Sequence, residues 1–229
     1  KTTQEFRLVS QSGGEFQWLA GLFFDKVKFK SEEQDYLFAG APVLFGGNEG
    51  NRDYKETAVY GDVTWNATAD LALTGGLRLA KYKQTDLVGQ LNPATGTVAF
   101  LLPVHFNETP KTYLLAAKYR LTPQSNAYAR AASGYRPGGA NFAAIDQTTG
   151  QPFPGARASF GTDSAWTYEV GYKANFPEST ASAEVSVFDT EWKDLQQFTQ
   201  PGGPGTAGFT SNLGKARIRG IEAGASFNP

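Results

Sequence analysis

The chain has 229 residues, a formal net charge of −1 and no cysteine. The lack of thiols excludes a disulfide scaffold and a thiolate metal site. A charge near zero without a Lys/Arg cluster gives no electrostatic reason to expect binding to nucleic acid or to anionic lipid.

Aromatic residues are frequent in a chain that is polar on average. It contains 17 Phe, 10 Tyr and 4 Trp, yet its mean hydropathy is −0.38. The longest apolar run, residues 98–104, is too short for a spanning helix. An outer-membrane β-barrel gives this mixture, because each strand shows one face to lipid and the other to water. Residues 1–5 lack the features of a signal peptide, which leaves a soluble protein or a segment cut from a longer precursor.

About nine segments have the period-two alternation of β-strands with one apolar and one polar side. The clearest is 71–80, where Leu71, Leu73, Leu77 and Leu79 alternate with other residues. The predicted strands are 2–10, 16–30, 54–65, 71–80, 113–120, 127–136, 166–175, a segment that begins at 181, and 209–227. The polar turn at 177–179 pairs its two neighbours as an antiparallel hairpin. We therefore predict an all-β, antiparallel up-and-down meander.

The connections between these segments alternate in length. Short turns are predicted at Gly13, Ala67, Gln124 and Glu178, long loops at Gly46, Pro93 and Gly150, and an intermediate one at Gly203. Short turns at one end of a sheet and long loops at the other are typical of transmembrane barrels. The pattern therefore predicts that residues 1–229 form a single β-barrel domain.

Aromatic residues gather near the predicted strand ends. Trp65, Phe176 and Phe227 lie at the short-turn end, and Tyr82, Tyr135, Trp166 and Trp192 lie at the long-loop end. Two aromatic girdles at the two membrane interfaces would explain this distribution.

Several stretches resemble the barrel of TonB-dependent outer-membrane receptors. They are ETAVYGDVTW at 56–65 with LTGGLR at 73–78, NAYAR at 126–130 with GYRPGG at 134–139, YEVGYK at 168–173 with VFDTEWKDLQ at 187–196, and NLGKARIRGIE at 212–222. They are spread over most of the chain in the order expected for that family.

The resemblance implies a location in the bacterial outer membrane and a barrel of about 22 strands with a plugged lumen. It also implies uptake of a scarce nutrient, often a ferric siderophore, with energy passed through TonB. The implied partners are outer-membrane lipid, the receptor's own plug domain, TonB, and a small ligand such as a siderophore or an oligosaccharide. With about nine strands and no plug, the chain corresponds to a middle portion of such a barrel. Its open strand edges are expected to cause self-association of the isolated chain.

Charged side chains on the polar sides of the strands are predicted to face the lumen. They are Arg78, Lys118, Arg120, Arg130, Arg136, Glu169, Lys173, Glu184 and Glu222. They could guide anionic ligands, but we favour solvation of the wall through mutual ion pairs, since charges of both signs are ordinary in such barrels.

Ligand contacts are expected in the long extracellular loops, because loops on a rigid scaffold carry recognition. The candidates are Tyr36, Phe38, Arg52, Phe100, His105, Phe142, Phe153, Arg157 and Phe160. A single histidine forms neither a metal site nor a catalytic triad, and Asp189, Glu191 and Asp194 lack the spacing of a calcium loop. We therefore predict no cofactor, no metal site and no enzymatic activity. The alternatives are a soluble β-rich module that binds carbohydrate, and a passive porin.

Overall fold

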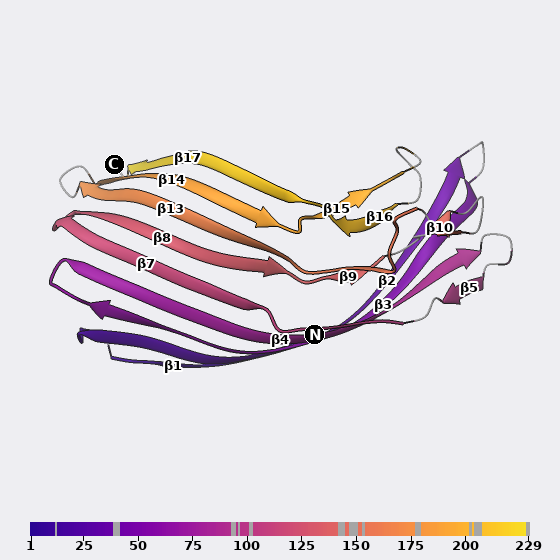
Figure 1. Cartoon of the computed structure of the whole chain (residues 1–229), viewed down its shortest axis with the longest axis horizontal. Coiled ribbons are helices and arrows are strands. Elements are labelled where there is room, and N and C mark those ends of the chain that lie inside the picture. The colour runs from indigo at the N-terminus through magenta and orange to yellow at the C-terminus, as the bar shows by residue number, and fades with distance from the viewer. Residues whose placement is uncertain are drawn as a thin grey trace.

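Nine long strands lie side by side in one antiparallel sheet in the computed structural model (Figure 1). The structure describes residues 1–11, 13–38, 42–92, 95, 97–100, 103–141, 145–146, 151–152, 154–176, 180–201, 203 and 208–227. The order in the sheet is β1-β2-β3-β4-β7-β8-β13-β14-β17. Each strand therefore pairs with the next long strand in the chain, which confirms the predicted all-β meander.

The nine strands are β1 (Thr2–Val9), β2 (Phe16–Phe38), β3 (Pro42–Asn66), β4 (Leu71–Asn92), β7 (Lys111–Thr122), β8 (Ser125–Arg136), β13 (Asp163–Phe176), β14 (Ala181–Lys193) and β17 (Lys215–Phe227). Two short strands, β5 (Thr97–Phe100) and β6 (Val104–Glu108), pair with β4. Three small ladders join β9 (Gly139–Ala140) to β12 (Ser159–Phe160), β10 (Ile145–Asp146) to β11 (Gln151–Pro152), and β15 (Gln196–Thr199) to β16 (Phe209–Asn212). None of the described residues belongs to a helix long and apolar enough to cross a membrane.

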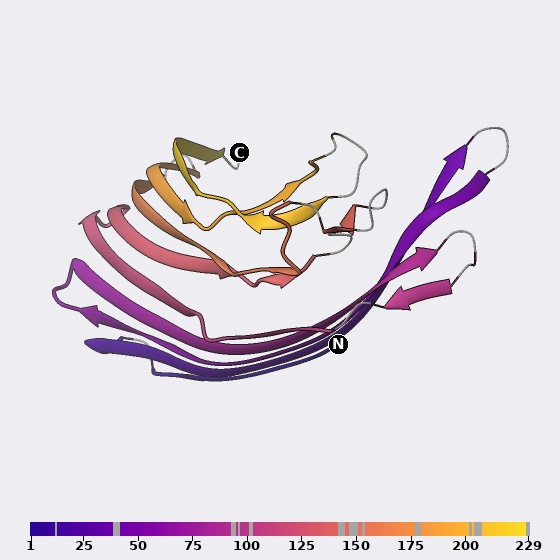
Figure 2. The same ribbon diagram turned by 45° about the vertical axis from the view of Figure 1, so that its right-hand side comes forward.

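The sheet is strongly curved, and the outer parts of β2, β3 and β4 extend beyond their neighbours (Figure 2). The prediction of long loops around Gly46 and Pro93 is therefore wrong, because strands occupy most of residues 31–53 and 85–110. The hydrogen-bonded register continues through the polar residues, as in the pairing of Lys30 with Asn51. Strand ends that project into water need no apolar side, so the hydropathy alternation disappears there while the backbone ladder continues. The predicted strand 209–227 is also interrupted, at Gly214 with φ +62°.

The two faces of the sheet differ in chemistry. Residues opposite each other on neighbouring strands point to the same side, and the register aligns large apolar residues such as Leu22 with Val59, and Leu77 with Tyr113. Leu115 is 61% exposed, Val170 62% and Ile221 75%. We call this side the apolar face and the other the polar face. A contiguous apolar face that the chain leaves uncovered marks contact with lipid or with another protein.

Only some of the aromatic residues predicted to form the two girdles lie on the apolar face. On the apolar face Phe16 stacks on Trp65 near the short turns, with ring centres 6.2 Å apart, and Tyr113 stacks on Trp166 nearer the long ends, at 6.0 Å. Tyr82 and Trp192 do not join a girdle. Tyr82 is fully buried, and the Arg136 guanidinium lies 4.6 Å above the Trp192 ring. The side chains of Tyr82 and Trp192 point to the polar face, because successive residues of a strand alternate between the two faces of the sheet.

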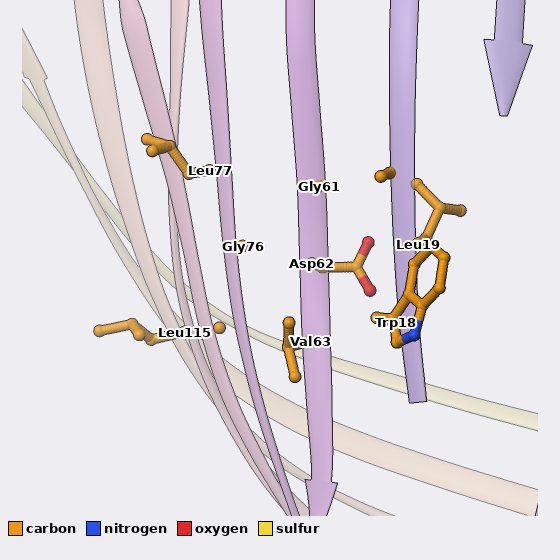
Figure 3. A pocket seen from close by; sticks show the side chains of 10 residues that line it. Trp18, Leu19, Gly61, Asp62, Val63, Gly76, Leu77 and Leu115 are labelled. Carbon is orange, nitrogen blue, oxygen red and sulfur yellow. The ribbon is translucent and has the colours of Figure 1, made fainter. Parts of the chain in front are cut away.

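A shallow depression of about 520 Å³ interrupts the apolar face. Its walls include Trp18, Leu77 and Leu115, which come from three different strands, and Gly61 lies between them (Figure 3). Gly75 also lines the depression. Apolar walls on the uncovered side of the sheet do not suit a charged nutrient. The candidate functional surface is therefore the polar face.

Candidate functional site

Ion pairs connect neighbouring strands across the polar face. The Arg78 guanidinium donates to Glu56 Oε1 at 2.7 Å, and the Tyr54 hydroxyl donates to Glu56 Oε2 at 2.5 Å. Arg78 also lies 4.8 Å from the centre of the Phe23 ring. This part of the face is a packed and charge-balanced wall across β2, β3 and β4.

A second group joins β8, β13 and β14. Lys173 Nζ donates to Glu184 Oε2 at 2.8 Å and lies 5.7 Å from the centre of the Tyr128 ring. The Tyr128 hydroxyl donates to Glu169. Opposite charges thus alternate between adjacent strands, which is the pattern expected for a solvated wall.

The polar face of β4 holds the connection that follows β8. Asp86 is nearly buried and accepts hydrogen bonds from Arg52 Nε at 2.8 Å, Gln84 Nε2 at 2.7 Å and the backbone N–H of Ala140 at 3.1 Å. Ala140 belongs to β9, so a carboxylate of the wall fixes the backbone of a connection.

Tyr82 adds to the same attachment. Its hydroxyl lies 2.8 Å from Thr162 Oγ1, and it accepts a hydrogen bond from the backbone N–H of Gly138 at 3.3 Å. The connection between β8 and β13 is therefore attached to β4 at several points, and it partly covers the polar face at the long end of the sheet.

A third network surrounds Asp163, the first residue of β13. Its carboxylate accepts hydrogen bonds from Arg136 Nε at 3.0 Å and from the backbone N–H of Gln196 at 3.1 Å. The Gln196 side chain donates to the carbonyls of Pro137 at 2.9 Å and Gly161 at 3.0 Å. Burial raises the pKa of Asp163, but the hydrogen bonds from Arg136 and Gln196 outweigh it, and the pKa lies below the ordinary value.

The register places all nine charged residues predicted to face the lumen on the polar face. Five of them, Arg78, Arg120, Arg136, Lys173 and Glu184, form salt bridges. Arg120 pairs with Asp70 in a short turn, at 2.9 Å. Lys118, Arg130 and Glu222 form no salt bridge with any described residue, and Glu169 is bound by Tyr128. Salt bridges thus involve about half of the group, but only Lys173 and Glu184 pair with each other.

The structure does not gather the predicted ligand residues into one place. Tyr36, Phe38, Arg52, Phe100 and His105 lie in strands and not in loops, whereas Phe142 and Phe153 lie outside the described residues. Arg52 points to the polar face and binds Asp86. His105 is exposed on the opposite side, with Nδ1 3.0 Å from Thr85 Oγ1.

Two predicted ligand residues lie at the connection that follows β8. Arg157 is exposed, and its carbonyl accepts a hydrogen bond from Asn141 Nδ2 at 2.8 Å. Phe160 is half-buried opposite Gly139, with its ring against that glycine. Arg157 and Phe160 are therefore near each other, at the long end of the sheet.

Tyr82, Gln84, Asp86, Asp163 and Gln196 hold the connections in place, a role that was predicted for none of them, and Tyr82 was expected in an aromatic girdle. A signal for the first three was present, since they alternate with Lys81, Lys83 and Thr85 at the period of a strand. No group of three His, Cys, Asp or Glu within the described ranges is close enough to hold a metal ion. Asp189 is bound by Arg217 and Arg219 instead.

Comparison with known proteins gives one family. A family model described as "TonB dependent receptor-like, beta-barrel" matches residues 1–228. The pesticin receptors of Yersinia enterocolitica and Yersinia pestis are each 30% identical over 173 residues, which is 74% of this chain and 23% of theirs.

Solved structures agree on the fold. The ferric yersiniabactin uptake receptor FyuA from Yersinia pestis aligns with a TM-score of 0.76 at 24% identity, over 98% of this chain and 32% of that one. The ferric-catecholate import receptor Fiu from K12 E. coli aligns with a TM-score of 0.69 at 18% identity, over 99% of this chain and 35% of that one. The chain thus spans about a quarter to a third of the proteins that it matches.

Proposed function

Because the chain belongs to the TonB-dependent receptor family as part of its β-barrel, we propose that it is the middle portion of a receptor that takes up a scarce nutrient. The family consists of transport receptors of the bacterial outer membrane, and the chain is located there. The finer proposal is that the nutrient is a ferric siderophore, carried past a plug domain elsewhere in the protein with energy supplied by TonB.

The observation that carries this proposal is the division of one curved sheet into an uncovered apolar face and a charged polar face. A lipid-facing band backed by a polar interior is the arrangement of an outer-membrane barrel. A soluble carbohydrate-binding module would not leave side chains such as Ile221 and Val170 largely exposed. The similarity to structures of receptors named for ferric yersiniabactin and ferric catecholate supports an iron-chelate ligand.

We further propose that the ligand approaches from the long end of the sheet, where the connections lie. Arg157 and Phe160 are the described candidates for contact there, and Arg52 lies on the same polar side. A cation and an aromatic ring suit an anionic, partly aromatic chelate. His105, on the opposite face, stays outside this group.

Uptake of radioactive iron by cells tests the proposal. A strain without its own siderophore receptors receives the intact receptor and is given ferric yersiniabactin, a ferric catecholate or ferric citrate under iron limitation. We expect uptake of one chelate, its loss in a strain that lacks TonB, and reduced uptake for Arg157→Ala. Uptake that continues without TonB would indicate a passive porin instead.

A further inference from the structure

Three side-chain amides join the connection that follows β8 to the connection that follows β14. They belong to Asn141, Gln196 and Asn212, and we call them the amide seam. In the part of the chain that the structure describes, no strand ladder pairs one of these connections with the other. The amide seam takes the place of a ladder, because a side-chain amide carries both a donor and an acceptor, as a peptide group does.

Asn212 pairs with Gly161 as the backbone of a neighbouring strand would. Its Oδ1 accepts a hydrogen bond from the Gly161 N–H at 2.6 Å, and its Nδ2 donates to the Gly161 carbonyl at 3.0 Å. Its Nδ2 also donates to the carbonyl of Asp194 at 2.8 Å. The Gly161 carbonyl accepts a further hydrogen bond from the Gln196 side chain. Both backbone groups of the residue after Phe160 are therefore bound by the connection that follows β14.

Asn141 is buried and ties three segments of the chain together. Its Nδ2 donates to the carbonyl of Arg157 at 2.8 Å and to the carbonyl of Thr210 at 2.9 Å. Its Oδ1 accepts a hydrogen bond from the Thr210 N–H at 2.7 Å. The N–H of Asn141 donates to the carbonyl of Ala158 at 2.9 Å. One buried residue thus fixes the backbone of Arg157 and Ala158 and attaches it to β16.

The segment held in this way would otherwise have little to order it. Ala156 and Arg157 lie outside any strand, and the Arg157 side chain is exposed. Surface segments of this kind are usually mobile, whereas the amide seam binds this one at Arg157 and Gly161. A segment that is ordered before the ligand arrives loses less conformational entropy on binding, so that the ligand binds more tightly.

We infer that Asn141 and Asn212 are positioning residues for recognition of the nutrient. They hold the backbone of residues 157–161 in the arrangement in which Arg157 meets an anionic chelate, and they act through that backbone. The inference rests on the proposed function, in which Arg157 contacts the ligand. It adds that recognition depends on residues 194–214, a connection that contains none of the predicted ligand contacts.

The test is uptake of radioactive iron at increasing concentrations of ferric yersiniabactin, a ferric catecholate or ferric citrate, by cells that carry the intact receptor. Asn141→Asp and Asn212→Asp preserve size and the accepted hydrogen bond but lose the donated ones. If the binding arrangement falls to about a tenth of the population, the half-saturating concentration rises about tenfold at an unchanged maximal rate. Asn175→Asp is the matched control at an exposed residue near a short turn, and it should change neither quantity.

A double substitution separates positioning from a merely structural role. In an Arg157→Ala background, Asn141→Asp should raise the half-saturating concentration less than about threefold, because residues that act through each other are not additive. A tenfold effect that persists without the Arg157 side chain would overturn the inference. So would a lower maximal rate at an unchanged half-saturating concentration. If Asn141→Asp reduces the amount of receptor in the membrane, Asn212→Asp takes its place.

A spin label gives a readout that needs no ligand. Attached through Ala158→Cys to the intact receptor without other cysteines, the label should become more mobile in Asn141→Asp and Asn212→Asp but not in Asn175→Asp. If the natural receptor takes up none of the chelates, the proposed function fails and the label alone decides. Equal mobility in all four proteins would then overturn the positioning role.

Discussion

The ring of Tyr128 lies over Gly171, which is opposite it on the neighbouring strand of the polar face. A Cβ placed on Gly171 would be 2.6 Å from Tyr128 Cε1. Tyr60 covers Gly21, and Phe188 covers Gly220, in the same way. An aromatic ring over a glycine shields the backbone that the glycine leaves exposed, and it fixes the register of the two strands.

Gly171→Ala should destabilise the receptor by about 1–3 kcal/mol, because the new methyl group must displace the Tyr128 ring and its hydrogen bond to Glu169. Urea unfolding followed by tryptophan fluorescence measures this change. Gly134→Ala is the matched control on the same face, since a Cβ there meets no atom within 4 Å. Equal losses of stability for the two substitutions would show that the packing of the Tyr128 ring does not require a glycine at position 171.

Asp86→Ala should loosen the connection between β8 and β13. The change removes the acceptor of Arg52, Gln84 and the Ala140 N–H. We expect a loss of about 1–3 kcal/mol, because buried donors lose their partner, and faster cleavage of that connection by a protease. Asp53→Ala is the control, since Asp53 lies on the other face with 40% of its side chain exposed. A cleavage rate unchanged by Asp86→Ala would contradict the attachment.

Asp163 should make the long end of the sheet sensitive to acid. Arg136 and Gln196 hold the folded pKa below the ordinary value despite burial. A depressed folded pKa gives stability that is present above the unfolded pKa of about 3.9 and is lost as the pH falls through the folded value. Unfolding measured between pH 7 and pH 2 should show a smaller acid loss for Asp163→Asn than for the natural residue. If the natural protein and Asp163→Asn lost stability equally as the pH falls, Asp163 would not be the cause of the acid sensitivity.

The sequence predicted the fold best where one face of a strand meets an apolar environment. In 71–80 and 166–175 the alternation identified both the strand and its faces, because burial in lipid constrains every second residue. Beyond Lys26, Lys55 and Lys81 that constraint ends. Strand and loop then have the same polar composition, so the outer parts of β2, β3 and β4 were mistaken for loops.

The polar networks were harder to predict because they depend on contacts across the sheet. Arg136 was recognised as a charge on the polar face, but its partner Asp163 is 27 residues away, and Gln196 is 60 residues away. Nothing in the local pattern of Asp163 distinguishes a buried acceptor from a solvated residue.

The edges of the sheet allow a test of whether this chain is a piece of a barrel wall. Among the described residues, β1 pairs only with β2, and β17 pairs only with β14, so each has one side without a strand partner. Unpaired strand edges are templates for further pairing, and the apolar face needs lipid or detergent. Residues 1–229 expressed alone should therefore form oligomers or aggregates, with a mass by light scattering several times the 24.7 kDa of the chain. The intact receptor is expected to be monodisperse in detergent, because its other strands would cover both edges. A stable monomer of residues 1–229 without detergent would contradict both the open edges and the lipid contact.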